Sequence, residues 1–297
     1  MSFSNQIKAE LTDIIIKQNC CKRAFISGLF FDAHIEGERI SVKTSSREYS
    51  DYLSKIATEY YKSDVELFEY TVHGNYRFEI VFFSQKLSDA LCAIDRGEEI
   101  SRAFNFSCIN CISAFLRGVF VSSATLNNPQ KSYHCEFILT NIQRAEGLYN
   151  YLLNAISSTP KIIRRKYGTG IYFKSSESIV ELLTYIGTVS MLFEFMDRQI
   201  VNEIRNNENR ATNCVTGNIN KSVTAAQRQI AAIKKIKAKG RFESLSTDLQ
   251  ETAILRIENP DVSLAELALL HKVTLTKSGL NHRLNKIIQE SEINYNE

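Results

Sequence analysis

Residues 115–124 read FLRGVFVSSA, and residues 25–34 read FISGLFFDAH. At an offset of ninety residues the two stretches align Phe25 with Phe115 and Gly28 with Gly118. Glycine costs about 1 kcal/mol relative to alanine inside a helix, so a glycine at the same place in two helical stretches indicates a compensating close contact. We therefore predict that the two helices pack on each other about a pseudo-twofold axis. The alternative is two core helices that merely tolerate a glycine.

The residues after each stretch match in kind as well. The first copy is followed by the alternating runs ERISVKTSS and YRFEIVFF, and the second by YHCEFILTN and GIYFKSS, with a helical pattern after each run. Each half therefore reads helix, strands, helix, strands, helix, which is the mark of an internal duplication. The prediction is an α+β domain of two halves with the order αββαββα, residues 1–100 with a leading helix and residues 101–197.

The pattern changes near residue 198. Residues 198–220 are polar and rich in asparagine, which predicts a helix running into a linker. A basic amphipathic helix follows, with Gly240 placed to end it, and three short helical patterns complete the chain. Residues 221–297 are therefore expected to form an all-α domain.

Composition sets limits on the class of protein. The chain has 297 residues, 44% of them hydrophobic, and a net charge of +3, as in an ordinary globular protein. No apolar run is long enough to span a bilayer, and Lys8, Glu10 and Asp13 interrupt the apolar residues of the N-terminus. We expect a cytoplasmic protein, associated with the nucleoid if it binds DNA, and no membrane partner.

The seven cysteines are an odd number at irregular spacing, which favours free thiols over disulfides. Cys108 and Cys111 form a CxxC pair, but no second pair follows at the spacing of a zinc finger or ribbon. Cys20 and Cys21 are adjacent and cannot easily hold one ion. We therefore predict no metal, no catalytic residue and no cofactor.

Positive charge is concentrated near the C-terminal domain. Residues 209–242 carry eight lysines and arginines without one aspartate or glutamate, a run too one-sided for an ordinary solvated helix face. Lys234 and Lys235 lie in this block, and we expect them to contact phosphates of double-stranded DNA.

The last helical patterns predict a helix-turn-helix motif. Ser263 and Glu266 have the spacing of a capping box at the start of one helix, and Thr276 is a candidate N-cap for the next, KSGLNHRLNKIIQE. At about 100° per residue, Leu280, Leu284, Ile287 and Ile288 share one side of that last helix, which predicts a face buried in the domain.

The candidate DNA contacts lie on the opposite side of this helix, with Lys277, Asn281 and Arg283 flanking that side. Recognition helices insert their N-terminal residues into the major groove, so Ser278, Asn281 and His282 are expected at base edges. Lys277, Arg283 and Lys286 are expected at phosphates. The alternative is a small three-helix bundle whose polar face is simply hydrated.

Several strings together resemble the WhiA family of bacterial sporulation and cell-division regulators: SFSNQIKAEL, AFLRGVFVSSATL, NCVTGNINK, SLAELALL and TKSGLNHRLNKI. The resemblance covers essentially the whole chain. It implies a domain like that of LAGLIDADG homing endonucleases, a linker and a helix-turn-helix domain. It also implies DNA binding, transcriptional control of sporulation in some bacteria, and roles in cell division and chromosome segregation in others. The turn HKVTLTKSG departs from the family pattern because it contains no proline.

LAGLIDADG nucleases hold a divalent cation with an Asp or Glu at the eighth position of each motif, where it activates water. The matching positions in this chain are Ala33 and Ser123, and neither is a carboxylate. Asp32 lies one residue away, which turns it by about 100° from the shared axis. We expect a DNA-binding transcription regulator without nuclease activity, with the transcription machinery as a second class of partner.

Two alternatives remain open. One is an active metal-dependent endonuclease. The other assigns DNA binding wholly to residues 215–297 and makes the N-terminal domain a protein-interaction module.

Overall fold

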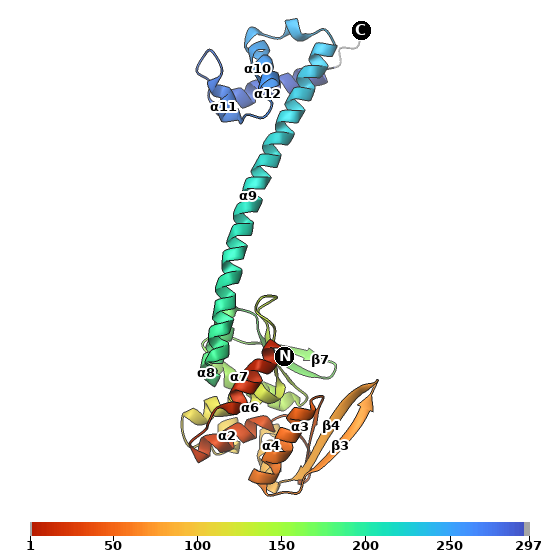
Figure 1. Cartoon of the computed structure of the whole chain (residues 1–297), viewed down its shortest axis with the longest axis vertical. Helices are drawn as coiled ribbons and strands as arrows, with labels where there is room; N and C mark the ends of the chain where they lie inside the picture. Colours follow the sequence, from red (N-terminus) through yellow and green to blue (C-terminus); the bar gives the residue numbers. More distant parts are fainter. Residues whose placement is uncertain (1, 294–297) are drawn as a thin grey trace. The chain divides into compact units, whose positions relative to one another are not determined.

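The computed structural model describes residues 2–293. Their contacts divide the chain into two compact units, Met1–Glu203 and Ile204–Glu297. The first unit is mixed α and β and the second is helical, which confirms the predicted α+β fold followed by an all-α C-terminal part (Figure 1). Among the described residues, no helix has both the length and the apolar character needed to cross a membrane.

The two halves of the first unit share the order αββαββα, and the first half also contains α1, η1 and α5. The first half contains α1 (Phe3–Asp13), α2 (Asn19–Leu29), β1 (His34–Glu36), β2 (Arg39–Thr44), α3 (Arg47–Ile56), the π-helical turn η1 (Ala57–Tyr61), β3 (Glu66–Val72), β4 (Asn75–Phe83), α4 (Gln85–Asp95) and α5 (Ile100–Ala103). The second contains α6 (Asn110–Ser123), β5 (Ala124–Leu126), β6 (Cys135–Leu139), α7 (Ile142–Ala155), β7 (Lys161–Arg165), β8 (Gly168–Phe173) and α8 (Ser176–Ile186).

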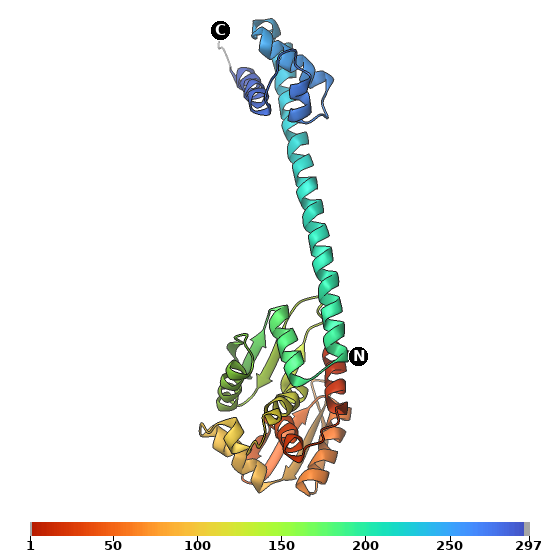
Figure 2. The ribbon, with the colours of Figure 1, turned by 90° about the vertical axis from the view of Figure 1, so that its left-hand side faces the viewer.

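The sheets confirm the duplication. The strand orders are β1-β2-β4-β3 and β5-β6-β8-β7, and all neighbouring strands are antiparallel. The strands of the first half (orange) and those of the second half (green) form two separate sheets (Figure 2). The period of ninety residues therefore corresponds to one structural repeat.

The two glycines lie where α2 and α6 touch. A Cβ atom built on Gly28 would be 2.2 Å from the backbone oxygen of Phe115, and one built on Gly118 would be 2.1 Å from that of Phe25. Both distances are far below any real Cβ contact, so only glycine permits this helix spacing. The predicted close packing of the two helices is confirmed.

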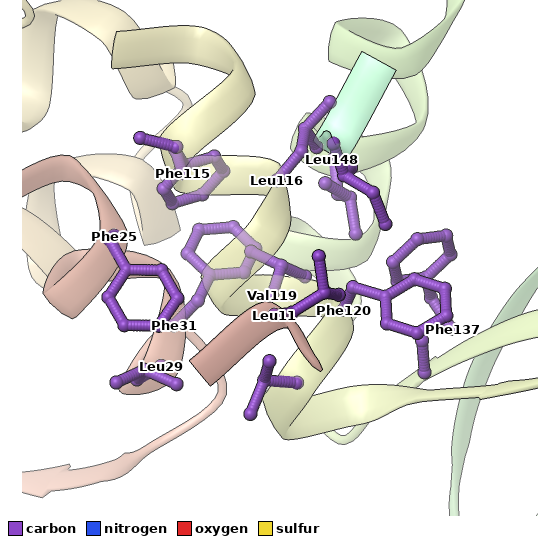
Figure 3. Close-up of a cluster of buried hydrophobic side chains, with 14 of the residues drawn as sticks. Leu11, Phe25, Leu29, Phe31, Phe115, Leu116, Val119, Phe120, Phe137 and Leu148 are labelled. Atoms are coloured by element: carbon purple, nitrogen blue, oxygen red, sulfur yellow. The ribbon is translucent and has the colours of Figure 1, made fainter. Parts of the chain in front are cut away.

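Aromatic and aliphatic side chains from both halves share one core (Figure 3). Phe31 from the first half packs edge-on against Phe115 from the second, with ring centroids 5.1 Å apart. Phe120 packs in the same way on Phe137 of the second sheet, with centroids 5.9 Å apart. The halves are therefore one folding unit with a continuous apolar interior.

Polar contacts also join the halves, and they are not symmetric. Arg144 on α7 forms a bidentate ion pair with Asp95 on α4, with nitrogen–oxygen distances of 2.8 and 2.9 Å. Its Nη1 also donates to the backbone oxygens of Phe31 and Ala33, at 3.0 and 2.6 Å. Each of the three nitrogens of this buried guanidinium therefore donates at least one hydrogen bond, as a buried charge requires.

The helix α9 (Ser190–Ala238) is continuous where a linker was expected. Residues 198–220 are helical throughout and almost all exposed. The segment contains no proline, and its asparagines each cost only a fraction of a kcal/mol in a helix, so nothing interrupts the hydrogen-bond ladder. The predicted stop at Gly240 is confirmed by its left-handed backbone, with φ of 67°.

Glu10 of α1 caps the start of α9. Its carboxylate accepts hydrogen bonds from the backbone nitrogens of Val189, Ser190 and Met191, at 2.7, 2.8 and 2.9 Å, and from the Thr188 hydroxyl at 2.6 Å. Burial alone would raise the pKa of Glu10, but these hydrogen bonds outweigh it, and the pKa lies below its ordinary value of 4.5. An acidic group here also matches the positive end of the helix dipole.

Candidate nucleic-acid interface

The second unit is a small helical bundle around its own core. The last turns of α9 are followed by η2 (Phe242–Ser244), α10 (Thr247–Glu258), α11 (Leu264–Leu269) and α12 (Lys277–Glu292). Its buried core consists of Ile233, Ile236, Leu245, Leu249, Ala253, Leu267, Ala268, Leu280, Leu284 and Ile287. The helices α11 and α12 occupy the places predicted for the two helices of a helix-turn-helix motif.

Both predicted helix starts are confirmed. In the capping box of α11, Glu266 N donates to Ser263 Oγ at 3.3 Å and Ser263 N donates to Glu266 Oε2 at 2.9 Å. In α12, Gly279 N donates to the Thr276 hydroxyl at 3.1 Å. These caps fix where each helix begins, and therefore which α12 side chains stand in its first turn.

The connection between the two helices is longer than expected. It runs over residues 270–276, whereas a typical motif has a turn of about three or four residues. The extra length folds back onto α10: His271 is buried, and Lys272 N donates to Glu251 Oε1 at 3.1 Å. The turn without proline is therefore held by α10 and not by its own backbone stiffness.

A buried arginine that was not predicted from the sequence holds the preceding loop. Arg256 on α10 donates to the backbone oxygens of Pro260 and Val262 at distances of 3.0 to 3.1 Å. A basic residue beside the Asn-Pro break between α10 and α11 was the available signal, since such loops expose carbonyl groups that need donors. Its role is to position α11, the first helix of the motif.

The two faces of α12 are as predicted. Leu280, Leu284 and Ile287 are buried, and Ile288 is half-buried at the edge of the core. The side chains expected at DNA are exposed on the other side: Lys277, Ser278, Asn281, His282 and Lys286. Within residues 2–293, no ion pair involves Lys277 or Lys286, so both ammonium groups are available to an anion.

Arg283 differs from its neighbours on α12. Its Nη2 lies 2.9 Å from Asp248 Oδ2 on α10, and only 22% of its side chain is exposed. Residue 283 flanks the buried face of the helix, which turns its long side chain toward α10 and away from the outer surface. In this structure the Arg283 guanidinium is therefore paired within the protein, and its contact with a phosphate stays a prediction.

Lys234 and Lys235 are exposed on α9, beside the buried Ile233 and Ile236. Within the unit, two ion pairs reach the C-terminal end of α12: Arg228 of α9 pairs with Glu292 (3.8 Å), and Arg241, which follows α9, pairs with Glu290 (3.7 Å). The predicted basic residues thus form two groups, one at the first turns of α12 and one on α9.

In the first unit, the positions that hold the cation in LAGLIDADG nucleases carry no ligand. Ala33 is buried, and the Ser123 hydroxyl donates to the backbone oxygen of Val119 on its own helix, at 2.8 Å. Both residues line a cavity of about 940 Å³ that also contains Asp32.

Asp32 is occupied by hydrogen bonds to the other half. Its carboxylate accepts from Thr140 N at 2.9 and 3.0 Å, from the Thr140 hydroxyl at 3.1 Å and from Asn141 N at 3.4 Å. Burial raises the pKa of Asp32 above its ordinary value, although these donors act in the opposite direction. The carboxylate therefore anchors the start of α7, and its lone pairs are turned toward protein donors.

The charges on the sheets are mixed and largely paired with each other. Lys43 lies opposite Glu79 in the β2–β4 register, with 3.9 Å between Nζ and Oε2. Arg165 donates to Glu136, which also lies 3.4 Å from His134. Cations that already have anionic partners, such as Lys43 and Arg165, add little net positive potential for a phosphate backbone.

The structure also brings together four thiols that the sequence analysis kept apart. The Sγ atoms of Cys20, Cys21, Cys108 and Cys111 all lie within 4.8 Å of one another. The expectation that the CxxC pair lacks a partner pair is therefore wrong. Its partners come from the other half of the duplication, and only the contact between α2 and α6 reveals them.

Comparison with known proteins gives consistent matches over the whole chain. A family model described as the WhiA LAGLIDADG-like domain matches residues 112–205, and one described as the WhiA C-terminal HTH domain matches residues 209–290. The curated "Probable cell division protein WhiA" of Oceanobacillus iheyensis is 34% identical, over 98% of this chain and 97% of that protein. The protein of the same name from Alkaliphilus metalliredigens is 30% identical over 97% of each chain.

The matches extend to a solved structure. The full-length DUF199/WhiA protein of Thermotoga maritima aligns over 98% of both chains, with a TM-score of 0.58 and 25% identity. The similarity in three dimensions therefore covers the same length as the similarity in sequence.

Proposed function

Because this chain belongs to the WhiA family, whose C-terminal helix-turn-helix domain implies DNA binding, we propose that it regulates transcription by binding double-stranded DNA through α12. The regulated genes then belong to cell division and chromosome segregation, with sporulation as the further role in relatives that sporulate. The bound protein is found on the nucleoid, and the transcription machinery is its second class of partner.

One observation supports the proposal: the exposed side of α12 carries polar side chains that can hydrogen-bond to base edges and lysines that have no ion-pair partner among residues 2–293. Asn281 can pair with an adenine edge through two hydrogen bonds, and Ser278 and His282 stand beside it in the first turns of the helix. Lys277 and Lys286 flank them as phosphate contacts. Lys234 and Lys235 add a second group of cations on α9.

The test is a salt titration of DNA binding by the full chain, measured by fluorescence anisotropy on a labelled duplex. We expect Lys277→Ala and Lys286→Ala each to weaken binding to every sequence and to reduce the slope of log affinity against log salt by about 1. Lys86→Ala, an exposed lysine on α4 of the first unit, is the matched control and leaves the slope unchanged. Equal slopes for all three variants and the parent chain would place the DNA surface elsewhere.

We further propose that the chain does not cleave DNA. Ala33 and Ser123 offer no carboxylate, and the Asp32 oxygens are engaged by Thr140 and Asn141. A cation between α2 and α6 has no charged ligand at the motif positions, so no water is activated there. Incubating the chain with bound duplex and Mg²⁺ or Mn²⁺ tests this: sequence-specific cutting that Asp32→Ala abolishes would establish the nuclease alternative.

A second role is favoured for the first unit, that of a protein-interaction module. Its strands expose apolar side chains, among them Phe68, Ile138 and Ile163, beside the paired charges of the sheets. Such a surface matches a protein partner better than a phosphate backbone. The test is the binding of a piece containing residues 1–203: salt-dependent DNA affinity comparable to that of the full chain would refute this assignment.

A further inference from the structure

We propose that Cys20, Cys21, Cys108 and Cys111 bind one structural zinc ion that links the two halves of the first unit. Cys108 Sγ lies 3.6 Å from the Sγ atoms of both Cys20 and Cys21 and 3.5 Å from that of Cys111. All four sulfur atoms fall within 4.8 Å of one another. No other group of three or more potential ligands occurs among residues 2–293.

The spacing is that of a tetrahedral tetrathiolate. Zinc binds cysteine sulfur at about 2.3 Å, so the corners of a regular tetrahedron lie about 3.8 Å apart. The observed separations of 3.5 and 3.6 Å are close to this value. A disulfide requires about 2.05 Å between two sulfur atoms and does not require a third and fourth thiol beside them. An iron–sulfur cluster places several irons between its ligands, which moves the cysteine sulfurs farther apart than one ion does.

The duplication explains how the ligands meet. Cys21 and Cys111 are separated by the repeat offset of ninety residues, so they are equivalent positions on α2 and α6 and face each other across the pseudo-twofold axis. Cys20 precedes Cys21, and Cys108 stands one helical turn before Cys111. The adjacent pair Cys20–Cys21 was expected to be a poor chelator, but each of these two thiols lies near Cys108.

The N-terminal ends of two helices lie beside the four thiols. Cys20, Cys21 and Cys111 lie in the first turns of α2 and α6, helices of 11 and 14 residues, and Cys108 lies just before α6. The positive dipole ends of both helices therefore lie near the sulfur atoms, and a helix N-terminus attracts negative charge such as that of metal-bound thiolates. Four thiolates carry more charge than one Zn²⁺ neutralises, and the helix ends offset part of the remainder.

Gln18 completes the surroundings. Its Oε1 accepts from Cys21 at 3.3 Å and from Cys108 at 3.5 Å when the thiols are protonated. Metal binding releases those protons. The amide group then presents its N–H to the thiolates after a simple rotation, as the outer partners of metal ligands commonly do. Gln18 occupies the position equivalent to Cys108 in the other half, so the two repeats contribute one ligand and one supporting amide there.

The site would be coordinatively saturated, and two of its four ligands are partly exposed to solvent. Four protein ligands leave no open coordination position, which is typical of a structural and not a catalytic zinc. Cys21 and Cys111 are buried, whereas Cys20 and Cys108 are half-buried and provide the route by which the ion enters. The zinc would tie together the N-terminal ends of α2 and α6, the helices whose glycines touch further along.

The first experiment measures metal content in the full chain, purified under reducing conditions without chelator. By elemental analysis we expect one zinc per chain for the parent and a loss of zinc for Cys108→Ser and Cys21→Ser, because each variant removes one of the four ligands. Cys92→Ser and Cys214→Ser, which change cysteines outside the cluster, are the matched controls and keep one zinc per chain.

The second experiment does not depend on the variants folding. The parent chain is stripped of metal and titrated with Co²⁺, which in a tetrahedral tetrathiolate site gives intense visible bands and sulfur-to-cobalt charge transfer. We expect these bands to saturate at one Co²⁺ per chain and to disappear when Zn²⁺ is added. A reduced chain that gives no such bands, or one purified with iron and sulfide in place of zinc, overturns the proposal.

Discussion

The contact between α2 and α6 makes a sharp prediction about Gly28 and Gly118. Helix propensity alone says that Gly28→Ala should stabilise the protein by about 1 kcal/mol. The new Cβ, however, would lie 2.2 Å from the Phe115 backbone oxygen and 2.8 Å from Val119 N. An ordinary contact begins at 3.4 Å, so the helices must separate by about 1 Å, and backbone atoms cannot rotate away as a flexible side chain can.

Moving two contacting atoms apart by about 0.5 to 1 Å loses about a quarter to a half of their dispersion energy, and this loss applies at each contact between the separated helices. Overpacking of a core typically costs about 1–3 kcal/mol, and the upper end applies here because the interface runs along the centre of the apolar core. After the gain in propensity is subtracted, we expect a net loss of about 2 kcal/mol in the free energy of unfolding.

The assay is urea unfolding of the full chain, followed by a probe in the first unit. Gly147→Ala is the matched control because it lies within α7 of the same unit and its Cβ would be 3.8 Å from the nearest atom, Ile100 Cδ1. We expect the control to stabilise by about 0.5–1 kcal/mol. If Gly28→Ala and Gly118→Ala stabilised as the control does, the helix contact would not have the geometry described.

Three further predictions follow from individual side chains. Arg283→Ala breaks the ion pair with Asp248, so we expect the second unit to lose about 0.5–1 kcal/mol of stability in thermal unfolding. The slope of log DNA affinity against log salt should stay constant. A slope reduced by about 1 would mean that Arg283 contacts a phosphate. Asn281→Ala should cost about 1–3 kcal/mol on the specific site and far less on random duplex, measured by competition; equal losses on both would remove Asn281 from base readout. Because the folded pKa of Glu10 lies below 4.5, the stability that it contributes is present above that pH and is lost as pH falls through the folded pKa. The difference in unfolding free energy between the parent chain and Glu10→Gln should therefore be constant near neutral pH and shrink on acidification. A difference that does not change with pH would mean that the negative charge of Glu10 does not contribute to the cap of α9.

Local signals in the sequence were sufficient for much of the fold. The repeat offset, the alternating runs and the cap residues Ser263 and Thr276 are short-range patterns, and the structure confirms the elements that they predicted. The side of α12 that faces the core was equally predictable, because helical periodicity decides it without knowledge of the partner helices.

What the sequence could not reveal depends on tertiary contacts. The four thiols come from segments 88 residues apart, and spacing rules for zinc motifs search only nearby residues. The partner of Arg283 lies on α10, 35 residues away, so its side chain was counted among the exposed cations. The continuity of α9 was missed because asparagine-rich sequence suggests loops, although no residue in the segment forbids a helix.

The contacts of Asp32 and Arg144 have a consequence for the history of the duplication. Asp32 of the first half binds the start of α7, and Arg144 of the second half reaches back to Asp95 and to the backbone at Phe31. The counterpart of α7 in the first half is α3, whose Arg47 pairs with Asp51 and Glu69 inside its own half. The two repeats have therefore diverged: the first half supplies the carboxylates Asp32 and Asp95, and the second half supplies the guanidinium of Arg144. Arg144 belongs only to the second half and Asp95 only to the first, so a symmetric dimer of a single repeat would lack this ion pair.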